Sequence, residues 1–156
     1  MDELDSAIVD HLQRDARQTN RELARKLGIA PSTCLERVRG LRNRGVITGY
    51  HATVDLGALG RPVQALLSVR VRPSSREAVE GFQRYAAGLP EVLSVFVVVG
   101  GEDVVVHVAV PDVDRLHSFL LDRLGERREV SGYRSSVIHQ HLVNPVASPS
   151  GTAGAP

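Results

Sequence analysis

The amino-acid sequence predicts an α+β protein in two parts, an all-helical N-terminal domain followed by a mixed domain of strands and helices. Apolar residues recur at helical spacing through about the first 45 residues, and from residue 63 onward strand-like alternation and helical stripes follow one another. Between the two patterns lies "DLGALGRP", a glycine-rich segment that ends in proline, which is typical of a hinge. We therefore expect an N-terminal domain at residues 1–54, a hinge at 55–62 and a second domain at 63–143.

The first two helices of the N-terminal domain are predicted by an apolar stripe and by a capping box. Leu4, Ile8 and Leu12 recur at helical spacing and form the stripe of the first helix. The second helix begins at Thr19, because Thr19 and Glu22 have the spacing at which each side chain satisfies a free backbone amide near the other residue.

A short turn leads into the third helix. Gly28 ends the second helix, since glycine adopts the left-handed conformation without a Cβ penalty, and Pro31 suits the first helical position. The third helix is predicted to bury one arc of side chains, namely Cys34, Leu35, Val38 and Leu41. Gly45 ends it, and "VITGYHATV" follows as a short extended segment. Two helices joined by such a turn form a helix-turn-helix, here of the winged type because a strand is expected after it.

The second domain is predicted to alternate strands and helices. Apolar and polar residues alternate over 63–72 as in a half-buried strand, and a helical stripe follows over 79–89. "VLSVFVVV" and "DVVVHVAV" flank Gly100-Gly101-Glu102, which is a hairpin signal. A second helical stripe begins after Asp112, an N-cap residue type, and "SSVIHQHL" is the closing strand. This order of elements predicts a ferredoxin-like βαββαβ domain.

Composition narrows the class of protein. The chain does not start with the pattern of a secretory signal, and its longest apolar run is too short to span a bilayer, so we expect a cytoplasmic protein with no membrane partner. The single cysteine, Cys34, agrees with a reducing compartment. The final segment, "NPVASPSGTAGAP", is small, polar and proline-rich, which predicts a disordered tail at 144–156.

Positive charge is concentrated on the helix-turn-helix. Residues 1–10 carry four acids and no base, whereas residues 11–50 carry nine bases against three acids. The second helix of such a motif fits the major groove, so this charge predicts double-stranded DNA as the partner; the alternative is that the arginines only solvate a helix surface. The side chains that we expect to contact base edges are those of Ser32, Thr33, Glu36 and Arg37. The side chains better placed for phosphates are those of Arg39, Arg42 and Arg44.

The chain resembles the Lrp/AsnC, or feast/famine, transcription regulators in two stretches. Their DNA-binding half is similar to "LDSAIVDHLQRDARQTNRELARKLGIAPSTCLERVRGLRNRGVITGY", in which "STCLERVRGL" is close to the leucine-responsive branch, and their effector-domain hairpin is similar to "VFVVVGGEDVVVHVAVPD". The resemblance covers nearly all of residues 4–142. It implies a sequence-specific DNA-binding transcriptional regulator whose DNA binding or assembly is modulated by an amino acid or a related small metabolite, with no cofactor. It also implies a homodimer that assembles further, commonly into an octamer.

Two residues of the third helix depart from the family pattern. Ala30 stands where the family usually has serine as the N-cap, and loss of such a cap typically costs about 1 kcal/mol. Gly40 replaces the usual arginine, which removes a possible phosphate contact and lowers helix stability by roughly 1 kcal/mol relative to alanine. These departures are the support for a second hypothesis, an effector-binding partner that no longer binds DNA.

The turn from Gly100 to Asp103 has two interpretations. It is either a tight hairpin turn with solvated acids, or a cleft in which a ligand carboxylate approaches the glycine backbone and an acid binds the ligand's ammonium group. The resemblance favours the second interpretation, because the family's effector site lies at this turn. The effector-binding residues expected at the turn are Gly100, Gly101, Glu102 and Asp103. The resemblance adds three polar residues of the last strand, Arg134, Ser135 and Ser136, with Ser135 replacing the usual threonine.

Other residues have both a functional and a structural interpretation. Cys34 could be a redox switch, but it falls on the buried arc of the third helix, where cysteine usually behaves as an apolar side chain. His139 and His141 share a strand face at a spacing that could hold a metal, although no carboxylate or cysteine lies beside them in sequence, and His107 is more typical of a structural residue.

An enzymatic alternative comes from the siroheme decarboxylases, which resemble this two-part architecture. They would use histidine and arginine near a tetrapyrrole pocket. Such an enzyme has no need of a basic helix with hydroxyls facing the groove, so we expect a regulator and not an enzyme.

Overall fold

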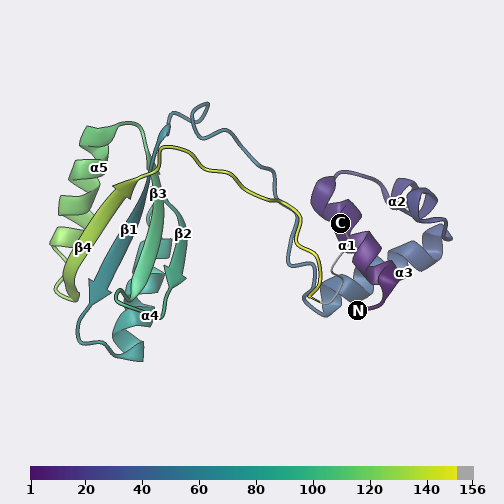
Figure 1. Ribbon diagram of the computed structural model, residues 1–156, viewed down its shortest axis with the longest axis horizontal. Coiled ribbons are helices and arrows are strands. Elements are labelled where there is room, and N and C mark those ends of the chain that lie inside the picture. Colours follow the sequence, from purple (N-terminus) through teal and green to yellow (C-terminus); the bar gives the residue numbers. More distant parts are fainter. Residues whose placement is uncertain (151–156) are drawn as a thin grey trace. The chain divides into compact units, whose positions relative to one another are not determined.

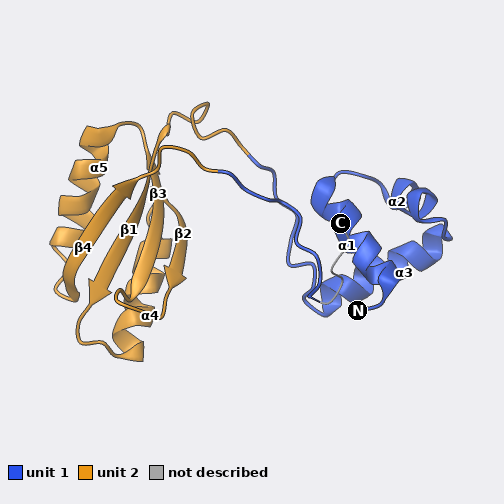
Figure 2. Cartoon of the chain, in the orientation of Figure 1, with its two compact units in different colours: residues 1–53, 142–156 blue, residues 54–141 orange. Residues whose placement is uncertain are grey.

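The computed structural model describes residues 1–150 and divides the chain into two compact units (Figure 1). Unit 1 holds residues 1–53 together with the chain from residue 142 onward, and unit 2 holds residues 54–141 (Figure 2). The first boundary lies one residue before the end that we expected for the N-terminal domain. The second differs from the expectation, since residues 142 and 143 group with unit 1.

Within residues 1–150, unit 1 contains three helices, α1 (Glu3–Arg14), α2 (Asn20–Leu27) and α3 (Pro31–Asn43). The predicted capping box is present, because Thr19 N–H donates to Glu22 Oε2 at 2.7 Å and Glu22 N–H donates to Thr19 Oγ1 at 3.2 Å. Gly28 ends α2 at φ 66°, in the left-handed region that favours glycine. The helix-turn-helix predicted from the sequence is confirmed.

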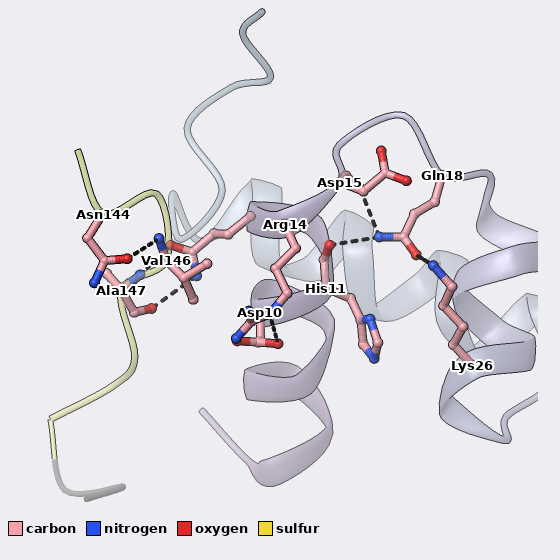
Figure 3. A network of polar contacts seen from close by, with 10 residues as sticks. Asp10, His11, Arg14, Asp15, Gln18, Lys26, Asn144, Val146 and Ala147 are labelled. Atoms are coloured by element: carbon pink, nitrogen blue, oxygen red, sulfur yellow. Dashed lines mark hydrogen bonds and ion pairs between the residues drawn. The ribbon is translucent and has the colours of Figure 1, made fainter. Parts of the chain in front are cut away.

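The core of unit 1 is formed by apolar side chains from all three helices. The buried members are Ile8, Leu23, Ala24, Cys34 and Leu41. Leu35 differs from the expectation, since it is 38% exposed and the buried arc of α3 is centred on Cys34 and Leu41 instead. Gln18 joins the ends of two helices beside this core, because its amide donates to His11 O at 2.7 Å and accepts from Lys26 Nζ at 3.0 Å (Figure 3).

The expected wing is missing from the described chain between α3 and the first strand, where no residue is in a β-strand. Gly45 turns the backbone at φ 71°, and the amides of Val46 and Ile47 donate to Leu41 O at 2.9 and 3.3 Å. These bonds direct the segment back onto the end of α3, where Ile47 packs against the core. A strand needs a partner for its backbone groups, and the extended pattern of "VITGYHATV" could not supply one.

The last described residues, 142–150, lie outside helices and strands but contact unit 1. Ala147 O accepts a hydrogen bond of 3.0 Å from the Gln13 side chain, and Ala147 N–H donates one of 2.8 Å back to it. Asn144 Oδ1 accepts from Val146 N–H at 3.2 Å (Figure 3). The disordered tail expected at 144–156 therefore differs from the structure at Ala147, and its residues 151–156 lie outside the described residues.

Unit 2 contains an antiparallel sheet with two helical segments. Its elements in the described chain are β1 (Val63–Val71), α4 (Arg76–Ala87), β2 (Val92–Val97), β3 (Val104–Val110), α5 (Val113–Phe119), the π-helical turn η1 (Leu120–Gly125) and β4 (Val130–Val137). The strand order is β2-β3-β1-β4, with neighbours antiparallel (Figure 1). The predicted ferredoxin-like βαββαβ domain is confirmed. The second helical stripe, expected as one helix, changes to π-helical bonding at Leu120.

One face of the sheet forms the core of unit 2 and the other is open. Leu67 and Val69 of β1 are fully buried in one cluster with Phe82 of α4 and Phe119 of α5. Their neighbours in β1 point to the opposite face, where Leu66 is 39% exposed. Phe96 of β2 lies on that same open face, is 51% exposed, and pairs with Val105. No helix among residues 1–150 is long and apolar enough to cross a membrane.

Candidate nucleic-acid interface and effector turn

The start of α3 lacks a side-chain cap. Ala30 is the N-cap residue and forms no side-chain hydrogen bond, while Pro31 occupies the first helical position. Pro31 has no amide N–H to satisfy and therefore reduces the number of free donors at this end. Ser32, Thr33 and Glu36 are exposed on the first turns of the helix, where a major groove would be reached.

α3 and its C-cap residue Arg44 together carry four arginines, and two of them are turned toward α1. Arg44 Nη2 lies 2.7 Å from Asp5 Oδ2, and Arg37 Nη1 lies 3.2 Å from Asp5 Oδ1. Arg37 also pairs with Asp2, and Asp2 in addition caps α1 by accepting from Asp5 N–H at 2.8 Å. The Asp5 amide and then the Arg37 guanidinium lower the pKa of the Asp2 carboxyl.

Asp2 and Asp5 engage two arginines that the sequence predicts to contact DNA, Arg37 and Arg44. Asp5 is 3% exposed and is the buried charged residue of the described chain, so its two arginines compensate a carboxylate that water cannot reach. The sequence predicts base contacts for Arg37 and phosphate contacts for Arg44. The signal in the sequence for their pairing with α1 is the run of acids in residues 1–10.

The other two arginines of α3, Arg39 and Arg42, are exposed and form no ion pair with any described residue. They differ in this respect from Arg44, for which the sequence predicts the same phosphate-contacting role. The uncompensated positive charge of α3 therefore lies at Arg39 and Arg42.

At the β2–β3 turn, Asp103 is bound to the end of β1 and is not free for a ligand. Its Oδ2 accepts from Val71 N–H at 2.8 Å and from Arg72 Nη1 at 3.2 Å, and its Oδ1 accepts from Ser74 Oγ at 3.2 Å. Asp103 N–H donates to Val69 O at 3.1 Å. The Val71 amide is the main cause that lowers the pKa of this carboxyl, with Ser74 and Arg72 adding to it. Asp103 therefore fixes the turn to β1.

Glu102 pairs with residues from two strands. Its Oε1 lies 3.4 Å from Arg134 Nη2 of β4 and 3.7 Å from Arg70 Nη2 of β1. These residues line a hollow of about 200 Å³ together with Gly132 and Tyr133. Glu102 and Arg134 are predicted from the sequence, whereas Arg70 and Tyr133 are not, because the sequence does not show the register between β1 and β4.

The glycines of the turn leave its tip open. Gly100 has φ 156°, which disfavours other residues, and a Cβ built on Gly100 or Gly101 would meet nothing within 4 Å. A ligand therefore has access to this backbone.

The serines of β4 do not share one face. Arg134 pairs with Ser68 and Ser136 with Leu66, on the open face, whereas Ser135 pairs with the buried Leu67. Consequently Arg134 and Ser136 point to one side and Ser135 to the other.

The residues with alternative interpretations show no built site. Cys34 is fully buried, and burial raises the pKa of its thiol, which disfavours the reactive thiolate. The ring of His107 meets the ring of His141 at 5.8 Å, and His107 Nε2 lies 3.0 Å from Gln64 Oε1. Burial, with a smaller effect of His141, lowers the pKa of His107. Residues 1–150 contain no group of three or more metal-binding side chains.

Comparison with known proteins agrees with this geometry. The AsnC-type helix-turn-helix domain matches residues 1–42, and the Lrp/AsnC ligand binding domain matches residues 64–146. The HTH-type transcriptional regulator AldR of Mycobacterium tuberculosis is 39% identical over 142 residues, which cover 91% of this chain and 79% of that protein. Transcriptional regulator AzlB of Bacillus subtilis is 31% identical over 138 residues, which cover 88% of each.

Solved structures extend the similarity to three dimensions. The crystal structure of a transcriptional regulator from Neisseria meningitidis in complex with L-Met has a TM-score of 0.87, with 29% identity and 96% of each chain covered. The crystal structure of AldR of Mycobacterium tuberculosis has a TM-score of 0.74, with 34% identity, and covers 96% of this chain and all of that one. The chain belongs to the Lrp/AsnC family of helix-turn-helix transcriptional regulators, with an N-terminal DNA-binding domain and a C-terminal amino-acid effector domain.

Proposed function

We propose that this regulator binds double-stranded DNA through the exposed side of α3 and binds an amino acid beside the β2–β3 turn, in the cytoplasm. The observation that carries the effector site is the convergence of Glu102 with Arg70 and Arg134, which places one carboxylate and two guanidinium groups around one hollow. An amino acid carries the complementary charges on its carboxylate and ammonium groups.

The proposed ligand pose follows from the freedom of each group. Arg134 has a side chain that is 74% exposed, so it can turn from Glu102 to the ligand carboxylate at little cost. Glu102 then accepts from the ligand ammonium, and the Gly100–Gly101 backbone lies alongside. Asp103 holds the turn in place through β1. The related regulator from Neisseria meningitidis was solved with L-Met, which supports an amino acid as the ligand class.

The DNA contacts are divided by the ion pairs of α3. Ser32, Thr33 and Glu36 are proposed to contact base edges, and Arg39 and Arg42 to contact phosphates. Arg37 and Arg44 hold α3 against Asp5 and would have to leave a buried carboxylate to reach DNA, so we assign them to positioning the helix.

The assembly proposed for this function is a homodimer that associates further, up to an octamer. The open face of the sheet carries Leu66 and Phe96 without cover from the described chain, which supports a second copy as the cover. A dimer would present two α3 helices to one duplex. An effector changes DNA binding only if it prefers one assembly or conformation, so a site beside an exposed turn suits this control.

Calorimetric titration with each of the twenty common amino acids tests the effector site, with DNA binding measured in parallel. Wild type should bind at least one of them and change its DNA affinity, and Glu102→Gln should weaken that binding by roughly tenfold or more. Glu77→Gln is the matched control, because Glu77 is exposed on α4, lies outside the hollow and forms no ion pair with a described residue, and it should behave as wild type. Unchanged affinity in Glu102→Gln would remove the effector from this hollow.

A further inference from the structure

The end of α3 and the segment after it enclose a polar hollow. It has a volume of about 350 Å³ and is lined by Arg39, Arg42, Asn43, Ile47 and Thr48. Four of these five residues carry side-chain hydrogen-bond donors, and none is an acid. We refer to this feature as the α3 hollow.

The side-chain donors of the α3 hollow are unpartnered within residues 1–150. Among the described residues, the side chains of Arg39, Arg42, Asn43 and Thr48 form no hydrogen bond or ion pair, and all four residues are exposed. The neighbouring Arg44 is engaged with Asp5. The helix therefore divides its arginines between an internal acid and a hollow that contains none.

The two parts of the α3 hollow are held in a fixed relation by the turn between them. Leu41 O accepts from the amides of both Val46 and Ile47, and Ile47 packs into the core of unit 1. Thr48, the next residue, is thereby placed beside Arg39 and Arg42. The carbonyls of this helix end would repel an anion, but those of Gly40, Leu41 and Arg42 already accept backbone hydrogen bonds, and Arg39 and Arg42 add two positive charges to the lining of the hollow.

We propose that the α3 hollow binds one phosphate of the DNA backbone, with Arg39 and Arg42 neutralising its charge and Asn43 and Thr48 donating hydrogen bonds to its oxygens. This inference rests on the proposed binding of DNA by α3 and adds Asn43 and Thr48 to the contacting residues. Guanidinium groups pair with phosphate in a fork geometry, while hydroxyl and amide donors fix its position. The contact sets the register of α3 on the duplex and does not depend on base sequence.

The test combines protein variants with single methylphosphonate substitutions, each of which removes the charge of one phosphate. The duplex is one selected from random-sequence DNA by the wild-type protein. At one phosphate per half-site, the substitution should weaken wild-type binding by roughly tenfold. The Arg42→Gln and Thr48→Val variants should bind DNA with and without this substitution almost equally well, because each has already lost part of the contact to that phosphate. Arg42→Gln should also lower the slope of log affinity against log salt by about one unit, equally for all sequences.

Arg17→Gln is the matched control, since Arg17 is an exposed arginine of unit 1 with no ion pair to a described residue and lies outside the hollow. It should keep the methylphosphonate profile of wild type. If the affinity losses caused by Arg42→Gln or Thr48→Val and by the methylphosphonate are additive at every phosphate, the α3 hollow does not bind a phosphate, although the protein still binds DNA. Absence of salt-dependent binding by wild type to any duplex would instead overturn the DNA-binding proposal itself.

Discussion

Arg44 donates a hydrogen bond of 2.7 Å to Asp5, and this contact joins the C-terminal end of α3 to the first turn of α1. Arg37 reaches the other oxygen of the same carboxylate from two turns earlier in α3. The position of α3 on unit 1 therefore depends on an acid that lies 39 residues away in sequence.

The first prediction concerns this contact. Asp5→Ala removes the acceptor for both arginines and should lower the free energy of unfolding of unit 1 by roughly 1.5 to 3 kcal/mol, the range for hydrogen bonds to charged groups. Asp10→Ala is the control, because the ion pair of Asp10 within residues 1–150 is with Arg14 on the same exposed helix surface, and the change should affect stability little. Urea unfolding followed by circular dichroism measures both. Equal stability of the two variants would argue against a positioning role for Asp5.

The second prediction concerns the uncapped start of α3. Ala30→Ser supplies an oxygen that can accept from a free amide of the first turn, so it should stabilise unit 1 by about 1 kcal/mol. Ala30→Val offers no acceptor and serves as the control. The measurement is the midpoint of urea unfolding, read beside DNA affinity. If the serine variant is no more stable than the valine variant, a side-chain cap does not stabilise the start of α3, and Pro31 alone is sufficient there.

The third prediction concerns pH. Hydrogen bonds from Val71, Ser74 and Arg72 hold the pKa of Asp103 below its ordinary value of 3.8, so its charged form is favoured in the folded chain. A lowered folded pKa means that this stabilisation is present above pH 3.8 and is lost as the pH falls through the folded pKa. Wild type should therefore be more stable than Asp103→Asn at neutral pH, and the difference should shrink on acidification below 3.8. Hydrogen exchange of the Val71 amide is a local measure, and a difference independent of pH would contradict the prediction.

The fourth prediction concerns the open sheet face. Leu66→Glu or Phe96→Glu places a charge on an exposed apolar surface, so each should shift the protein toward monomers in sedimentation experiments at micromolar concentration. Leu121→Glu is the control, because Leu121 is 50% exposed on η1 rather than on this face, and it should leave the assembly unchanged. A wild-type monomer, or dimers that persist in both face variants, would exclude this face as the interface.

Local signals in the sequence were sufficient for most of the fold. The Thr19–Glu22 capping box and the Gly28 turn each act within a few residues, so they could be identified without knowledge of distant contacts. The order of strands and helices in unit 2 was likewise predictable from periodicity. The prediction of a wing was wrong because a strand needs a neighbouring strand to pair with. The amides of Val46 and Ile47 instead donate to the carbonyl of Leu41.

The functional residues were harder to predict because their roles depend on pairing. Asp103 and Glu102 are adjacent and both acidic, yet Asp103 is bound to β1 while Glu102 faces Arg134. Likewise, Arg42 and Arg44 look alike in sequence, and only the packing of α1 on α3 separates them. Ion pairing within the fold depends on residues that are distant in sequence. A motif within α3 therefore cannot predict which of its charged side chains are paired.

The return of Ala147 to Gln13 has a consequence for the architecture of the polypeptide. Because the chain passes from unit 1 into unit 2 and back again, unit 2 is an insertion within unit 1. The two units are consequently joined by two covalent connections, one before β1 and one after β4. A truncation before residue 142 would therefore leave a single covalent connection between the units and would remove the Ala147 contact from unit 1.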